Sequence, residues 1–262
     1  MTLPNILMED DFLVAFDKPA GMPVAPGAPR ARGASLMGLA RGRYGGLLAS
    51  VHRLDDEASG VVLFAKTKPA LDFLSGQFQS KTAAKVYLAL VGVLPAGGAP
   101  AAARDCAGRL PAEFSVDLPL GDDRHRPGLM RVQRGRGGTP GETRVRVLEP
   151  FGRFAWVECR PLGGRAHQVR AHLAACGAPV LNDRLYGDPP TVLLLSEIKR
   201  RYKGGRGPEK PLILRLALHA VSLGFTHPAS RERIEVAAPL PEDLVIALKY
   251  LRRFARPGAR RP

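Results

Sequence analysis

The chain has 262 residues, of which 45% are hydrophobic and 24% are charged, a balance that excludes a disordered or fibrous protein. Lysine and arginine total 39 against 24 acidic residues, which leaves a formal net charge of +15. We expect a nucleic acid as partner, because clustered cations release counterions from a phosphate backbone. A membrane surface is not expected, since no basic stretch has a bulky apolar face.

The sequence also indicates where the protein works. No stretch of eighteen uncharged apolar residues occurs, and the first residues lack the pattern of a cleavable leader, so a cytoplasmic protein is expected. Three scattered cysteines, Cys106, Cys159 and Cys176, are expected to be reduced thiols. Their spacing matches no metal site, and no phosphate-binding glycine motif is present. We therefore expect no metal and no nucleotide cofactor.

The first third of the chain reads as strands around an acidic turn. Leu71, Leu74 and Phe78 recur at helical spacing and predict a helix over 68–81. The segments on either side of the acidic turn, and the segment that follows this helix, are short apolar runs typical of strands. Strands are predicted at 12–16, 45–54, 60–66 and 84–94.

The remainder begins with a change of composition. Residues 95–145 are rich in Ala, Gly, Pro and Arg, which predicts a loop-rich basic excursion with short strands at 113–120 and 129–134. Two strands are predicted to meet at Gly152, and Gly177 is expected to close a helix. Later elements are predicted as a helix over 165–177, strands over 212–228 and 232–241, a helix over 241–254 and a basic tail over 252–262. The pattern favours one α+β domain over 1–262, with a mixed, mainly antiparallel sheet core and flanking helices.

The acidic turn places Asp55, Asp56 and Glu57 directly after His52 and Arg53. A solvated turn is the commonest explanation of such a run. The preceding cations would nevertheless keep an aspartate ionised, as a carboxylate nucleophile requires. Glycoside hydrolysis needs two carboxyl groups about 5 to 9.5 Å apart across a sugar, which neighbours on one turn do not readily supply. One working carboxylate, Asp55 at the end of the preceding strand, is therefore the candidate.

Two further features could carry chemistry. Arg165 is expected in the first turn of the helix over 165–177, where a cation opposes the helix dipole, so an anion such as an ionised aspartate is a natural partner. An ordinary surface arginine explains it equally well. His167 and His172 are five residues apart, which does not place them on one helical face for zinc. Tyr87 is either a core residue or a ring on which an unstacked base packs.

Taken in order, these segments resemble the RluA-type RNA pseudouridine synthases over about residues 9–243. The most specific matches are H-R-L-D-x-x-x-S-G at 52–60 and G-R-x-H-Q-x-R-x-H at 164–172. The resemblance implies the pseudouridine synthase fold with a central catalytic cleft, no cofactor, and a structured tRNA or rRNA stem-loop as substrate.

The resemblance also implies residue roles. Asp55 matches the aspartate that attacks the target uridine, Tyr87 the tyrosine that packs on the flipped base, and Arg165 the arginine paired with that aspartate. Arg53 matches the arginine that enters the RNA stack when the uridine flips out. The full set of expected substrate-binding residues is His52, Arg53, His167, Gln168, Arg170, Leu216 and Leu218, the two leucines as alternatives for the apolar wall of the pocket.

The sequence departs from the family pattern at a few positions. Ala58, Gly163 and Ala166 stand where hydroxyl residues are usual, and Asn182 replaces a usual glycine, so we expect altered local stability rather than lost activity. An N-terminal S4 domain, common in relatives, is not expected, which slightly favours tRNA or a small stem-loop, bound by a monomer. The alternatives are an RNA-binding or ribosome-assembly protein with little catalysis, and a glycosidase that cleaves rather than isomerises.

Overall fold

The computed structural model describes residues 2–26, 34–94, 109–126, 128–133, 135, 137–187, 190–204 and 207–255. Cys106, residues 95–108 of the basic excursion and residues 256–262 of the basic tail lie outside these ranges. Contacts between Cα atoms group the chain into two compact units, each built from several segments. The first unit contains Met1–Tyr87, Arg160–Ala166 and Leu218–Pro239, and the second contains Leu88–Cys159, His167–Ala217 and Leu240–Pro262.

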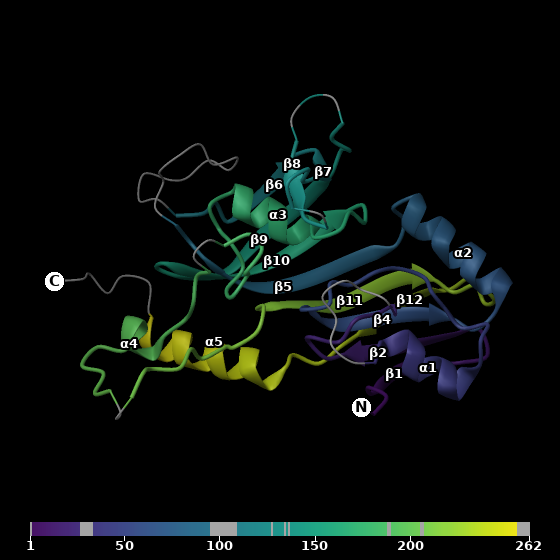
Figure 1. The fold of residues 1–262 in the computed structure, drawn as a ribbon, viewed down its shortest axis with the longest axis horizontal. Helices are drawn as coiled ribbons and strands as arrows, with labels where there is room; N and C mark the ends of the chain where they lie inside the picture. Colours follow the sequence, from purple (N-terminus) through teal and green to yellow (C-terminus); the bar gives the residue numbers. More distant parts are fainter. Residues whose placement is uncertain are drawn as a thin grey trace. The chain divides into compact units, whose positions relative to one another are not determined.

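The first unit is a sheet with two helices (Figure 1). Its strands follow the order β1-β2-β4-β11-β5, with β12 paired to β11 and β3 paired to β4. Most pairs are antiparallel, but β4 and β11 run parallel, with His219 opposite Ser59 and Ala220 opposite Gly60. Its elements are β1 (Ile6–Glu9), β2 (Leu13–Lys18), α1 (Leu36–Tyr44), β3 (Ala49–Ser50), β4 (Ser59–Ala65), α2 (Lys68–Gln79), the start of β5 (Ala84–Gly92), β11 (Leu218–Thr226) and β12 (Arg233–Ala237).

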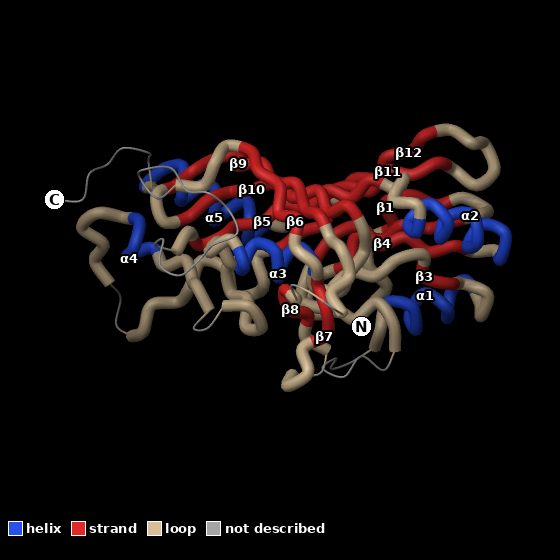
Figure 2. Tube along the Cα trace, turned by 90° about the horizontal axis from the view of Figure 1, so that it is seen from above, coloured by secondary structure: helices blue, strands red, loops and turns tan. Residues whose placement is uncertain are grey.

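Strand alternation explains how this sheet uses both faces. On one face, alternate residues of β2, β4 and β11 pack against Ala70 and Leu74 of α2. On the other face, the Phe16 ring meets the rings of Phe64 and of Tyr44 at the end of α1, with centroids 5.8 and 6.3 Å apart. All seven residues of β4 are therefore buried. Figure 2 shows the strands of this unit with α1 and α2 beside them.

The second unit continues from β5 in the order β5-β10-β9-β6, beside a separate two-stranded pair, β7-β8. Helix α5 is amphipathic, with Leu244, Leu248 and Leu251 buried, and Arg252 near its end bonds to Glu149 of β9 at 2.9 Å. The elements are β6 (Glu113–Asp117), β7 (Leu120–Asp122), β8 (Met130–Val132), β9 (Glu142–Phe151), β10 (Phe154–Leu162) up to Cys159, α3 (Gln168–Ala175), α4 (Leu195–Ile198) and α5 (Glu242–Phe254).

The expected α+β class with a mixed, mainly antiparallel sheet is confirmed. Three expectations about elements were wrong. The strand predicted over 212–228 is confined to β11, Leu218–Thr226. The strand predicted over 45–54 is only the two residues of β3, because Gly46 and Leu47 form a turn before them and the chain bends at Val51 and His52 after them. The helix predicted over 165–177 begins only at Gln168. The sequence pattern also missed β1, α1 and α4. In α1, Gly38 and Gly42 weaken the helical pattern. Ser35 nevertheless caps this helix, since its side chain accepts a hydrogen bond from Gly38 N at 3.1 Å.

Within the described ranges, no helix combines enough length and apolar character to cross a lipid bilayer.

Candidate active site

The acidic turn lies between β3 and β4 in the first unit, and a buried lysine holds it in place. Lys18, at the end of β2, is fully buried, and its ammonium donates to the Asp56 carbonyl at 2.9 Å and to the Met22 carbonyl at 2.7 Å. Gly21 N donates to the same Asp56 carbonyl at 2.8 Å. A buried ammonium is stable only when such acceptors surround it. The loop after β2 and the turn that carries Asp55 are thus tied together by one cation.

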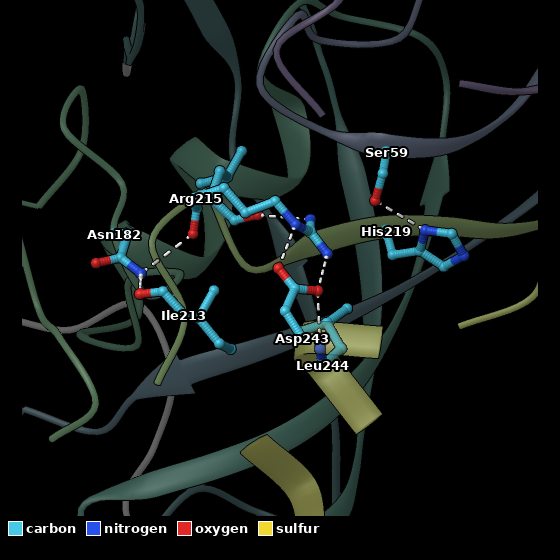
Figure 3. Close-up of polar contacts among 8 residues, drawn as sticks. Ser59, Asn182, Ile213, Arg215, His219, Asp243 and Leu244 are labelled. Carbon is cyan, nitrogen blue, oxygen red and sulfur yellow. Dashed lines mark hydrogen bonds and ion pairs between the residues drawn. The ribbon is translucent and has the colours of Figure 1, made fainter. Parts of the chain in front are cut away.

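The end of the H-R-L-D-x-x-x-S-G motif joins β4 to β11. Ser59 Oγ lies 2.9 Å from His219 Nδ1, and both side chains are buried (Figure 3). Gly60 has φ +116°, and a methyl group on it would lie 2.7 Å from the backbone nitrogen of Ala220. Only glycine allows β11 to approach this closely. The last two motif positions therefore serve the sheet that supports the turn.

Asp55 and Tyr87 are close enough to interact electrostatically. Both side chains are half-buried, and burial together with the Asp55 charge raises the pKa of Tyr87 above its ordinary value. The phenol is therefore neutral at physiological pH, which suits a ring platform or a hydrogen-bond donor rather than an anion. The structure thus brings together two residues that lie 32 positions apart, one on a turn and one on β5.

Lys85 lies on the same face of β5 as Tyr87 and contacts the segment that leads to Arg165. Its ammonium donates to the Gly163 carbonyl, and burial lowers the pKa of Lys85 to about 8. Arg165 itself is exposed and precedes α3, so the expectation that it lies in a helical first turn was wrong. The physical reason is His167, whose φ of 51° is left-handed and cannot belong to the helix.

His52 is held inside the first unit by both ring nitrogens. Leu63 N donates to Nε2 at 3.1 Å, Nδ1 lies 3.3 Å from the Arg53 carbonyl, and the ring stacks on Phe78 with centroids 4.9 Å apart. Burial is the main cause that lowers the pKa of His52 to about 4, so the ring is neutral. Arg53 is exposed, as a residue that enters an RNA stack must be.

The second motif belongs mostly to the second unit, where its polar residues contact the protein. Arg170 is buried and pairs with buried Asp183 through two hydrogen bonds of 2.8 and 2.9 Å. Gln168 is buried and donates to the Glu142 carbonyl at 2.9 Å. His167 Nδ1 lies 3.2 Å from the Tyr186 hydroxyl. These contacts show a structural use for each side chain, and a role in RNA binding stays a prediction.

His172, the last residue of the motif, is also part of the core of the second unit. Its Nδ1 lies 2.8 Å from Thr143 Oγ1 and its Nε2 lies 3.0 Å from the Leu118 carbonyl. Burial lowers the pKa of His172. Both ring nitrogens of His172 therefore lie within hydrogen-bond distance of groups inside the second unit.

The segment that contains Leu216 is anchored by polar contacts drawn in Figure 3. Asn182 Nδ2 donates to the carbonyls of Ile213 and Arg215 at 2.8 and 3.1 Å, and Arg215 forms a two-bond ion pair with Asp243 of α5. Asn182 has φ 58°, a left-handed region that asparagine tolerates better than most residues.

The expected site residues therefore divide between the units. Leu216 is buried in the second unit, whereas Leu218 is buried at the start of β11 in the first unit. The first unit contains Asp55, Tyr87, Arg165, His52, Arg53 and Leu218, and the second contains His167, Gln168, Arg170 and Leu216. Lys18 and Lys85 received no role from the sequence, although a single lysine in or beside an apolar strand was an available signal. Across the part of the chain that the structure describes, no group of three His, Cys, Asp or Glu side chains is arranged to hold a metal ion.

The chain is similar to known proteins in sequence and in fold. The profile of the family described as RNA pseudouridylate synthase matches residues 12–175. Ribosomal large subunit pseudouridine synthase D of Neisseria meningitidis serogroup A is 34% identical over 257 residues, which cover 95% of this chain and 61% of that protein. Ribosomal large subunit pseudouridine synthase C of Escherichia coli K12 is 35% identical over 94% of this chain and 70% of its own length.

A solved structure extends the match to three dimensions. Human RNA Pseudouridylate Synthase Domain Containing 4 has a TM-score of 0.67 and 26% identity, over 95% of this chain and 93% of that one. The chain spans about 61% of the length of the Neisseria relatives that it matches. The residues that the profile matches include Asp55 on its turn, Tyr87 on β5 and the whole G-R-x-H-Q-x-R-x-H motif. The chain belongs to the RNA pseudouridylate synthase family.

Proposed function

We propose that the protein is an RNA pseudouridine synthase in which Asp55 is the nucleophile. The observation that carries the proposal is that Asp55, on the turn before β4, lies near enough to Tyr87 on β5 for its charge to act on the phenol. An ionised carboxylate beside a neutral ring can attack a nucleotide that packs on that ring. Membership of the family supports the same assignment.

The reaction that we propose is balanced within one nucleotide. The bond between N1 and C1′ of uridine breaks as the Asp55 carboxylate forms a bond to C1′. A bond between C5 and C1′ then forms as the bond from Asp55 to C1′ breaks and frees the carboxylate, the C5 hydrogen leaves as a proton, and N1 gains a proton. No redox change occurs, so no cofactor enters the proposal. Arg53 would fill the space that the flipped uridine leaves, and Arg165 would pair with the Asp55 carboxylate.

Ribosomal RNA is the proposed substrate, because the relatives just named are ribosomal large subunit pseudouridine synthases. Exposed cations of the second unit support an RNA partner. They include Arg124 and Arg126 after β7, and Arg200, Arg201 and Lys203 after α4. We propose that the two units form one catalytic domain, since the chain passes between them at several points. We also propose that this domain acts as a monomer in the cytoplasm.

The test uses ribosomal and transfer RNA transcripts that carry tritium at uridine C5. The wild-type protein should release tritium into water from ribosomal RNA, with the chain and its base content intact. Asp55→Asn keeps the size of the side chain and removes its nucleophilic charge, so release should fall at least a thousandfold. Asp56→Asn is the matched control, since its carbonyl rather than its carboxylate holds the turn.

Three results would contradict the proposal. Loss of bases from the RNA would indicate a glycosidase, and equal release by Asp55→Asn would remove this residue from the chemistry. Tight binding of every transcript without release, including RNA within ribosomal precursor particles, would favour an RNA-binding protein.

A further inference from the structure

Lys85 is a half-buried lysine that the assigned catalytic roles leave unused. It is the second residue of β5, and strand alternation places it on the same face as Tyr87. Val86, between them, is buried and packs on the opposite face. Burial lowers the pKa of Lys85 to about 8, so the ammonium form of Lys85 predominates at neutral pH. A cation at this position therefore has to be stabilised by a specific acceptor.

The acceptor is the carbonyl of Gly163, at the end of β10. Gly163 has φ +121°, and it is followed by Gly164 and then by Arg165. A methyl group on Gly164 would lie 3.8 Å from Lys85 Nζ, so the ammonium lies beside both glycines. Two successive glycines have more backbone freedom than any other pair, and holding them in one conformation costs entropy. The lysine supplies a bond that restricts this segment just before Arg165.

The charged groups around this contact are few. His52 lies near enough for the Lys85 charge to lower its pKa, and His52 is neutral. Tyr87 shares the face of β5 and is also neutral, and the Asp55 charge acts on Tyr87. Arg160 and Arg165, before and after the glycines, are exposed. All of these residues belong to the first unit, so the local arrangement is complete within it.

We infer that Lys85 is a positioning residue, whose ammonium fixes the Gly163–Gly164 segment so that Arg165 is held ready for the catalytic aspartate. This inference rests on the proposed function, because Arg165 matters only if Asp55 is the nucleophile. The backbone carbonyl, which every residue has, is the group that Lys85 binds.

The first measurement is hydrogen exchange of the backbone amides, followed by mass spectrometry, in the peptide that covers 160–167. Lys85→Met removes the donor and should raise exchange there at least fivefold, while peptides of β2 and β4 stay unchanged. Lys68→Met, which alters an exposed lysine of α2, is the matched control and should change nothing near 163. This readout does not depend on catalysis. Unchanged exchange at 160–167 in Lys85→Met would overturn the inference.

The second measurement is tritium release from the ribosomal transcript between pH 6 and 9.5. Lys85→Met should lower kcat at least tenfold at pH 7 and leave KM within twofold. The wild type should lose kcat above about pH 8 as Lys85 deprotonates, whereas Lys85→Arg should stay active and keep its kcat to higher pH, because a guanidinium remains charged. A merely structural role of Lys85 would not change the pH at which kcat falls. If Lys85→Arg is active and its kcat falls at the same pH as that of the wild type, the inference is overturned, even if Lys85→Met fails to fold.

A failure of the proposed function can be distinguished from a failure of the role of Lys85. No release by the wild type at any pH would contradict the synthase activity, and with it the catalytic purpose of the contact. Normal release by the wild type together with wild-type kcat in folded Lys85→Met would contradict only the role of Lys85.

Discussion

The ion pair between Arg170 and Asp183 allows a direct test of whether this arginine serves RNA or the fold. The two side chains are only 2% and 0% exposed, and two hydrogen bonds join them. Asp183 Oδ1 also accepts from the backbone nitrogens of Leu185 and Tyr186 at 2.9 and 3.1 Å. Replacing Arg170 by methionine keeps most of the volume and leaves the Asp183 charge buried without its cation.

The size of the effect follows from that burial. Removing one partner of a buried ion pair costs about 3 to 5 kcal/mol of unfolding free energy, because the remaining charge stays desolvated. In a chain of this length each kcal/mol lowers Tm by about 2 to 4 °C, so Arg170→Met should lower Tm by roughly 6 to 20 °C. In the double variant Arg170→Met with Asp183→Asn, the amide oxygen still accepts the turn hydrogen bonds and no charge is stranded. We therefore expect the double variant to be more stable than Arg170→Met.

The assays are urea denaturation, which gives the unfolding free energy, and thermal denaturation, which gives Tm. Both are applied to the wild type, both single variants and the double variant, which together form a double-mutant cycle. RNA affinity is measured on the folded proteins at two salt concentrations. We expect the affinity and its salt dependence to be unchanged by Arg170→Met, since a buried guanidinium neutralises no phosphate. If Arg170→Met kept the wild-type Tm and weakened RNA binding with a smaller salt slope, the reasoning would be refuted and Arg170 would be an RNA contact.

Two further predictions concern the first unit. Gly60→Ala should lower the unfolding free energy by about 1 to 3 kcal/mol or more, because φ is +116° and the new methyl group meets Ala220. Gly76→Ala is the control in α2, where nothing lies within 4 Å of the new methyl group. It should raise the unfolding free energy by about 0.5 to 1 kcal/mol in the same urea titration. His52 has a folded pKa of about 4, below the ordinary 6.5, so stability is fully present above pH 6.5 and is lost as pH falls towards 4. His52→Asn should show a smaller loss of urea midpoint between pH 7 and 4, and equal slopes would contradict the assignment.

Much of the fold could be predicted because its signals are local. The apolar run of β4, the helical spacing of Leu71, Leu74 and Phe78 in α2, and the two strands that meet at Gly152 each depend on neighbours within one element. Where local signals were weak or misleading, the predictions failed. Glycines hid α1, and the left-handed φ of His167 moved the start of α3 to Gln168.

The sequence by itself determined the family, the α+β class and the candidate nucleophile, since these rest on residue order within two short motifs. Only the tertiary structure decided what the other polar residues do. In the folded chain Arg170 pairs with Asp183, and Lys18 donates a hydrogen bond to the turn after Arg53. Lys85 donates to the carbonyl of Gly163, 78 positions away. No local pattern contains such information, because the cost of burying a charge is set by acceptors that only the folded chain brings within hydrogen-bond distance.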